Sequence, residues 1–167
     1  MSQNKPLTRE QFDIEGDIKI AIVATRWNSH ITVQGLMQGA LARLDETEYG
    51  SKAADRFMVP GAVELTNAAA RLIDTGRYDA IVVLGCVIKG DTPHFDYVCQ
   101  SVTQGVTELN AKGQTPVIFG VLTVFDEQQA LDRAGGRLGN KGAEAVDAAL
   151  EMIELHQKIE LIDGGAV

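Results

Sequence analysis

Residues 80–98 read AIVVLGCVIKGDTPHFDYV, and this stretch decides the fold class. Its first five residues are apolar without polar alternation, which is typical of a strand covered on both faces in a parallel sheet. A loop between Gly85 and Gly90 follows, where glycine lets backbone approach a ligand closely. Thr92 then offers a hydroxyl, and His94 stands at the start of the next predicted helix. Because ligands of open α/β sheets bind beyond the carboxyl ends of the strands, this loop is a candidate binding site.

Apolar runs and helical patterns alternate along the rest of the chain. Strands are predicted at 18–24, 56–59, 80–87 and 116–122, and helices at 31–44, 63–73, 95–109, 126–134 and 141–158. Strands separated by helices predict right-handed parallel crossovers. The sequence therefore predicts a three-layer, flavodoxin-like α/β domain with a four-stranded parallel sheet flanked by helices. Its expected organisation is an N-terminal arm at 1–13, the domain at 14–160 and a C-terminal tail at 161–167.

Length, charge and cysteine content limit the classes of function. A chain of 167 residues suits one domain, and a net charge of −8 without a basic run argues against a nucleic-acid partner. The first 13 residues lack the apolar segment of a signal peptide, and no stretch reaches membrane-spanning length, so no membrane partner is expected. The two cysteines have neither metal-ligand nor disulfide spacing, which favours a cytoplasmic protein without a metal site.

Four loops follow the predicted strands and are expected at one edge of the sheet. They span residues 25–30, 60–64, 89–94 and 123–126. The single tryptophan of the chain, Trp27, lies in the first of them. An exposed indole is costly unless it stacks on another flat group, so a planar heterocycle is one candidate ligand.

Six sequence blocks, found in order along the chain, carry a resemblance to a known family. The blocks are RWN at 26–28, PGAVE at 60–64, GCVIKGDTPHFDYV at 85–98, FGVLT at 119–123, ALDRAG at 130–135 and NKG at 140–142. A single glycine-bracketed loop is weak support, whereas the combination is specific. From about Ile18 to Leu155 the chain resembles the lumazine synthases.

That resemblance implies an enzyme without metal or organic cofactor. Members of the family condense 5-amino-6-(ribitylamino)uracil with 3,4-dihydroxy-2-butanone 4-phosphate, the penultimate step of riboflavin biosynthesis, and release phosphate and water. The resemblance assigns His94 to proton transfer and Arg133 to charge compensation at the departing phosphate. It assigns pyrimidine and ribityl contacts to Trp27, Ala62, Val63, Glu64, Cys86, Val87, Ile88 and Phe119. It assigns phosphate contacts to Asp91, Thr92, Arg133 and Lys141.

The family also implies an assembly. Lumazine synthases form rings of five subunits, and some rings build shells of sixty. The resemblance implies that Phe119, Arg133 and Lys141 reach into the pocket of a neighbouring subunit, so the active site lies at a subunit interface. The sequence does not distinguish a pentamer from a decamer or a shell.

Three positions depart from the family pattern. Lys89 stands where arginine is common, Trp27 where phenylalanine is common, and Asp91 adds a negative charge to the phosphate turn. If the backbone N–H of that turn binds phosphate, the Asp91 carboxylate is expected to point outward, since an inward carboxylate would repel the ligand. The larger Trp27 ring suggests a further hypothesis, that the pocket retains flavin-like rings by stacking.

Plainer readings of the same residues stay open at this stage. His94 could only cap its helix, Glu64 could only complement the helix dipole, and Arg133 could pair with nearby carboxylates on the surface. Cys86 and Cys99 are expected to be small buried apolar residues. The chain could also be a flavin or lumazine carrier without catalysis, or a scaffold with relic pockets, although the presence of His94 and Arg133 favours the enzyme.

Overall fold

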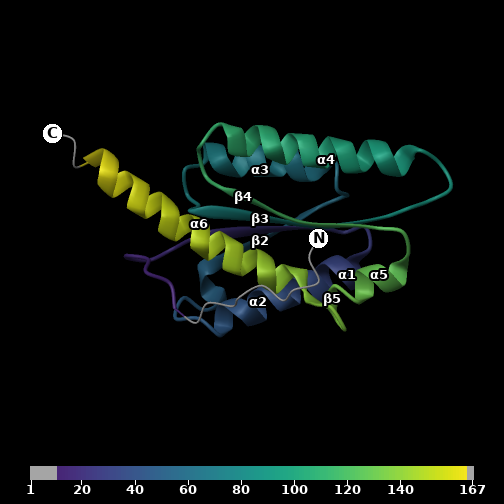
Figure 1. Ribbon diagram of the computed structural model, residues 1–167, viewed down its shortest axis with the longest axis horizontal. Coiled ribbons are helices and arrows are strands. Elements are labelled where there is room, and N and C mark those ends of the chain that lie inside the picture. Colours follow the sequence, from purple (N-terminus) through teal and green to yellow (C-terminus); the bar gives the residue numbers. More distant parts are fainter. Residues whose placement is uncertain (1–10, 165–167) are drawn as a thin grey trace.

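A parallel four-stranded sheet forms the centre of the computed structural model, which describes residues 11–164 (Figure 1). The strands are β1 (Ile20–Thr25), β2 (Ala54–Val59), β3 (Ala80–Ile88) and β4 (Val117–Val124). They pair in the order β2-β1-β3-β4, and every pairing is parallel. All of β1 and the first seven residues of β3 are buried, as their uninterrupted apolar sequences predict. The predicted sheet is therefore confirmed.

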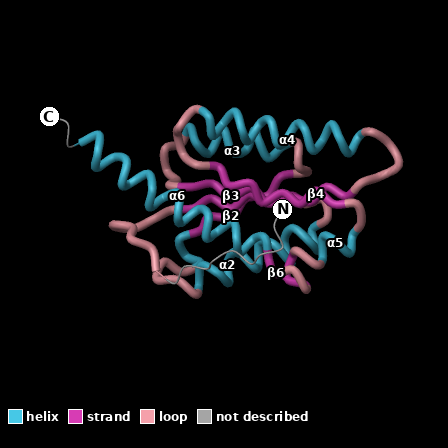
Figure 2. Tube along the Cα trace, in the orientation of Figure 1, coloured by secondary structure: helices cyan, strands magenta, loops and turns pink. Residues whose placement is uncertain are grey.

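Helices cover both faces of this sheet (Figure 2). One face packs against α3 (Glu64–Asp74) and α4 (His94–Ala111), with Leu65, Val102 and Val106 buried there. The opposite face packs against α2 (Gln38–Asp45) and α6 (Lys141–Gly164). Because successive side chains of a strand point to opposite faces, Ile22 joins one cluster and Val23 the other. The three-layer α/β architecture follows directly.

The single helix predicted over residues 31–44 is divided into three segments. It begins with α1 (Ser29–Ile31), continues as the π-helix η1 (Thr32–Met37), and ends as α2. Glycines allow another part of the chain to approach closely here. A Cβ built on Gly35 would lie 2.7 Å from the Cβ of Ala134, and one on Gly39 would lie 2.2 Å from Cγ of Asn140. This close packing is a tertiary constraint that helical periodicity does not reveal.

The helix predicted over residues 126–134 is wrong in its second half. Only α5 (Glu127–Leu131) is helical, and an antiparallel hairpin of β5 (Ala134–Gly136) and β6 (Gly139–Asn140) follows. Gly135 and Gly139 have φ values of 113° and 81°, in the region that glycine adopts without strain. The short 3-10 helix η2 (Ser51–Ala53) leads into β2, which begins two residues earlier than predicted.

The last helix is longer than the predicted range 141–158, because α6 continues to Gly164. Residues 161–164, expected as part of a tail, are therefore helical, while residues 1–10 and 165–167 lie outside the described part of the chain. At the other end, Phe12 is buried in the core beside α6 and α2. No helix between residues 11 and 164 combines the length and apolarity that crossing a bilayer requires.

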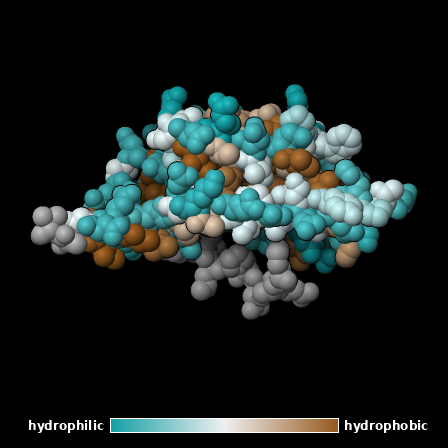
Figure 3. Space-filling model, turned by 90° about the horizontal axis from the view of Figure 1, so that it is seen from above, coloured by the Kyte–Doolittle hydropathy of each residue, from teal (hydrophilic) through white to brown (hydrophobic). Residues whose placement is uncertain are grey.

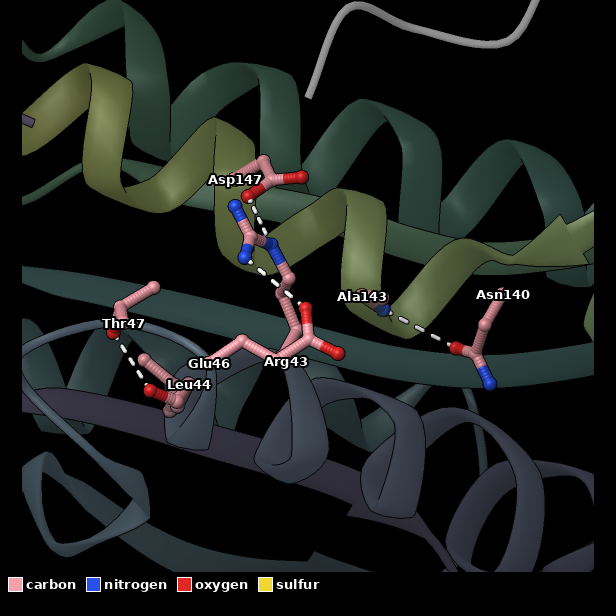
Figure 4. A network of polar contacts seen from close by, with 7 residues as sticks. All are labelled: Arg43, Leu44, Glu46, Thr47, Asn140, Ala143 and Asp147. Atoms are coloured by element: carbon pink, nitrogen blue, oxygen red, sulfur yellow. Dashed lines mark hydrogen bonds and ion pairs between the residues drawn. The ribbon is translucent and has the colours of Figure 1, made fainter. Parts of the chain in front are cut away.

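Polar contacts hold α6 against α2 and determine where α6 begins (Figure 4). The largely buried Arg43 donates from Nε to Oδ1 of Asp147 over 2.7 Å and from Nη1 to Glu46 over 3.2 Å. Asn140 caps α6, because its Oδ1 accepts from the N–H of Gly142 over 2.8 Å and its Nδ2 donates to the Gly35 carbonyl over 3.0 Å. The NKG block thus starts α6 and docks it on the π-helix.

Candidate active site

A cavity of about 420 Å³ lies beyond the carboxyl ends of β1, β2 and β3. Three loops build it, from Thr25 to Asn28, from Gly61 to Glu64, and from Cys86 to Val98. Its lining residues are Thr25, Trp27, Asn28, Gly61, Ala62, Val63, Glu64, Cys86, Val87, Ile88, Gly90, Thr92, His94, Phe95 and Val98. The expected convergence of these three loops is therefore observed, and it includes most of the predicted pyrimidine and ribityl contacts.

Trp27 presents an exposed ring from an anchored backbone. Its side chain is among the most exposed large apolar groups, at 75%. The Trp27 N–H donates to the Pro60 carbonyl over 3.1 Å, and the Thr25 hydroxyl donates to the Trp27 carbonyl over 3.0 Å. The backbone is thus fixed between two of the cavity loops while the indole stays available for stacking.

Asn28 is a structural determinant of this loop to which sequence reasoning assigned no role. Its φ of 58° and ψ of 42° make it the only non-glycine residue with positive φ in the described chain. Its Nδ2 donates to the Cys86 carbonyl over 3.1 Å, joining the loop after β1 to the end of β3. The sequence did contain a signal for this conformation, because asparagine at the end of a strand tolerates the left-handed region of backbone angles.

Glu64 begins α3 at the wall of the cavity. Its Oε2 accepts from the Gly61 N–H over 2.9 Å, which closes the loop before the helix. A carboxylate in the first turn also complements the helix dipole. The interpretation that Glu64 complements the helix dipole is therefore correct, and the same carboxylate also lines the cavity.

His94 is the first residue of α4, an 18-residue helix whose N-terminal N–H groups face the cavity loop. Its backbone N–H lies 3.4 Å from the Thr92 hydroxyl, a long contact at the helix start. Among residues 11–164, no side chain is hydrogen-bonded to its exposed ring. The imidazole is thus available to a ligand, next to helix N–H groups that favour anions.

Cys86 lines the cavity as a neutral thiol. Burial, followed by the negative charge of Glu127, raises the pKa of the Cys86 thiol to about 12. Burial also raises the pKa of the half-buried Cys99 thiol. Because the thiolate is the reactive form, neither cysteine is activated as a nucleophile, and the predicted burial of Cys86 is confirmed.

The other predicted ligands do not line this cavity. Phe119 lies on the edge strand β4 and is 41% exposed. Arg133 donates from Nη1 to the Gln129 carbonyl over 2.9 Å, and Lys141 pairs with Glu144 over 2.6 Å. The Asp91 side chain is exposed in the loop before α4 and is not among the lining residues.

The carboxylates near Arg133 have other partners. Asp132 pairs with Arg137 over 2.7 Å, and Glu127 pairs with His30 over 2.5 Å. The surface ion pairs considered for Arg133 are therefore not formed with these two groups. Within residues 11–164 there is no cluster of three or more His, Cys, Asp or Glu side chains arranged to hold a metal ion.

Comparison with known proteins identifies a family for this fold and site. A family model described as 6,7-dimethyl-8-ribityllumazine synthase matches residues 17–157. A protein of that name from Phocaeicola vulgatus is 45% identical over 146 residues, which cover 86% of this chain and 85% of the relative. A protein of the same name from Porphyromonas gingivalis is 50% identical, over 84% of this chain and 87% of the relative. Another, from Bacteroides fragilis, is 49% identical, over 82% of this chain and 95% of the relative.

Proposed function

The chain belongs to the 6,7-dimethyl-8-ribityllumazine synthase family, and on this premise we propose how its cavity performs the reaction. The enzyme joins 5-amino-6-(ribitylamino)uracil to 3,4-dihydroxy-2-butanone 4-phosphate. The convergence of Trp27, Glu64 and His94 on one cavity is the observation that carries this proposal. It brings together a stacking ring, a hydroxyl acceptor and a proton carrier.

The pyrimidine stacks on the exposed indole of Trp27, with Val87 and Ile88 along its edge. The ribityl chain lies along residues 62–64, where its hydroxyl groups form hydrogen bonds with backbone groups and donate to the Glu64 carboxylate. The phosphate of the second substrate lies at Thr92 and the start of α4. Helix N–H groups there are unpaired within the helix and favour an anion.

Proton transfer by His94 serves each chemical step. The uracil amine attacks the ketone carbon, and water leaves to give an imine. A proton is then removed from the neighbouring hydroxyl-bearing carbon, and phosphate departs from the next carbon with the electrons of its C–O bond. The enol that results tautomerises to a ketone, and the ribitylamino nitrogen attacks this new carbonyl with loss of a second water. Imidazole both accepts and donates protons near neutral pH, which suits this sequence of dehydrations and elimination. Positioning of the two substrates supplies much of the acceleration.

A neighbouring subunit completes the site in this proposal. Phe119, Arg133 and Lys141 lie outside the cavity of their own chain, and Phe119 is exposed on an edge strand. In a ring of five, these residues reach the adjacent cavity, where the Arg133 guanidinium pairs bidentately with the leaving phosphate. The assembly belongs in the cytoplasm, where free Cys86 and Cys99 stay reduced.

Mixing the two substrates with the protein and following product absorbance tests the activity. Wild-type protein is expected to form product, and His94→Ala is expected to slow turnover without abolishing it, since positioning by the pocket remains. Absence of product with the wild type would overturn the proposal in favour of a carrier or scaffold. Complete inactivity of correctly assembled His94→Ala protein would contradict the role given to positioning.

A mixing experiment tests the shared site. His94→Ala and Arg133→Ala proteins are each expected to be impaired, because each lacks one side of every site. When the two are coexpressed, some interfaces combine an intact His94 with an intact Arg133 from the next subunit. Specific activity above the average of the two variants is expected, and strict averaging would reject the interface.

A further inference from the structure

Helix α6 has two apolar faces, of which only one packs against the described part of its own chain, residues 11–164. Residues on the inner face, such as Leu150 and Ile153, are buried in the core. Three large apolar residues on another face are exposed: Leu155 at 45%, Ile159 at 44% and Ile162 at 73%. At about 100° per residue, these three lie within an arc of about 60° and nearly opposite Ile153. We call them the outer stripe.

The outer stripe lies on a helix end that is held firmly at its base. Gln157 accepts from the Glu15 N–H over 2.8 Å and donates to the Glu15 carbonyl over 3.0 Å. Beyond this anchor, residues 158–164 are all exposed, and α6 extends past the sheet (Figure 1). Hydrophobic surface gathers at this end of the molecule, on the left of Figure 3. Residues 158–164, which carry Ile159 and Ile162, also lie beyond residues 17–157, the part of the chain that matches the family model.

The outer stripe has the spacing of a single heptad of a coiled-coil seam. Intervals of four and three residues place Leu155 and Ile162 at d positions and Ile159 at an a position of a heptad. Lys158 then occupies a g position and Asp163 an e position. In a parallel pair of helices, a g residue faces the e residue five positions further along the other helix, so Lys158 faces Asp163 of the second copy. In an antiparallel pair centred on the same stripe, Lys158 would face its own counterpart, which is unfavourable.

We propose that the outer stripe docks in parallel against the outer stripe of a second copy of this chain. Lys158 already contacts Glu154 over 2.5 Å, and its ammonium has further donors for the Asp163 carboxylate of the other helix. An anionic lipid surface is a poorer occupant, because the chain has a net charge of −8 and Glu160 also lies on the exposed end of α6. Three residues a side make a small contact, weak between isolated chains and strengthened when several act together in an oligomer.

Two adjacent residues provide a matched test of the surface. Ile162 and Leu161 are 73% and 70% exposed, but Leu161 lies about 100° away, off the stripe. Sedimentation velocity over a range of concentrations is expected to show that Ile162→Glu shifts self-association to at least tenfold higher concentration. Leu161→Glu is expected to sediment like the wild type. Equal shifts in both variants, or a shift in neither, would overturn the proposal.

Crosslinking tests the orientation. In a parallel pair the two Ile159 side chains face each other, so mildly oxidised Ile159→Cys protein is expected to form a disulfide-linked dimer on a non-reducing gel. Leu161→Cys is the control, and both retain the native Cys86 and Cys99. If Ile159→Cys does not crosslink, the parallel pairing of two outer stripes is overturned. This holds even if Ile162→Glu changes sedimentation, because the stripe would then dock on another surface. Product formation by all variants is expected to be unchanged, which separates this outcome from a failure of the proposed function.

Discussion

The contact between Asn28 and the Cys86 carbonyl should stabilise both the fold and the pyrimidine platform. Asn28→Ala removes a hydrogen bond worth about 1 kcal/mol. It also places an alanine at φ 58°, which costs roughly 1–2 kcal/mol for an ordinary residue. The expected loss in free energy of unfolding is therefore about 2–3 kcal/mol. Asn28→Gly loses the bond but accepts the backbone conformation, so it should lose only about 1 kcal/mol.

Urea denaturation followed by the emission of Trp27 measures this difference, because Trp27 is the only tryptophan of the chain. The KM for the uracil substrate should rise more in Asn28→Ala than in Asn28→Gly, since the left-handed backbone at residue 28 orients the neighbouring indole. Asn110→Ala is the control. It loses two hydrogen bonds to Val117, of 2.8 Å each, far along the chain from the cavity loops.

That control should lower stability and leave KM unchanged. Equal losses of stability in the alanine and glycine variants of residue 28 would show that its backbone conformation carries no cost. A KM change in Asn110→Ala would mean that general destabilisation, and not the tether at Asn28, governs pyrimidine binding.

Four further outcomes follow from individual sites. Gly142→Ala should cost about 3 kcal/mol, because its Cβ would overlap the Leu36 carbonyl of the π-helix, and thermal unfolding measures the loss. Cys86 should resist alkylation at pH 8, as mass spectrometry of intact native protein can check. Its pKa of about 12 lies above the value near 9 of an exposed thiol, so its contribution to stability is complete below pH 9 and is lost as the pH rises towards 12. Wild-type protein should quench flavin fluorescence saturably, and Trp27→Ala should not. Asp91→Ala should change the KM for the ketone phosphate by less than about threefold, because an exposed carboxylate interacts weakly through water.

Each of these outcomes has a counterpart that would contradict it. Gly164→Ala has open space around its Cβ and should leave the melting temperature unchanged, so a similar loss there would remove the steric explanation. Rapid alkylation of native Cys86 would mean that the thiol is exposed or activated. No saturable quenching in the wild type would reject flavin stacking, and a large KM change in Asp91→Ala would place that carboxylate against the phosphate.

Apolar continuity made the sheet predictable. The strands β1 and β3 are buried on both faces, so their sequences contain almost no polar residue, and such runs are typical of a parallel sheet covered by helices. The loops that follow them were predictable for the same reason, because parallel strands bring their carboxyl ends to one edge. The sequence alone thus places Trp27 and His94 near each other.

The hairpin at residues 134–140 and the π-helix were not predictable from local patterns. Both depend on contacts between segments about 100 residues apart, as in the bond from Asn140 to the Gly35 carbonyl. The helical pattern of residues 126–134 continues through Ala134, but the chain turns there because Gly135 and Gly139 adopt positive φ. Periodicity indicates which face of an element is apolar, but it does not predict a turn that depends on contacts with a distant segment.

The amino-acid sequence alone determined the fold class, the edge of the sheet where the candidate site lies, and the residue types available there. It could do so because the burial of a strand and the direction of its chain follow from the local order of apolar and polar residues. Only the tertiary structure decided that Asn28 tethers the tryptophan loop to Cys86, that Arg133 lies away from its own cavity, and that α6 keeps a second apolar face exposed. These features depend on the distances between segments remote in sequence, and such distances are set by packing.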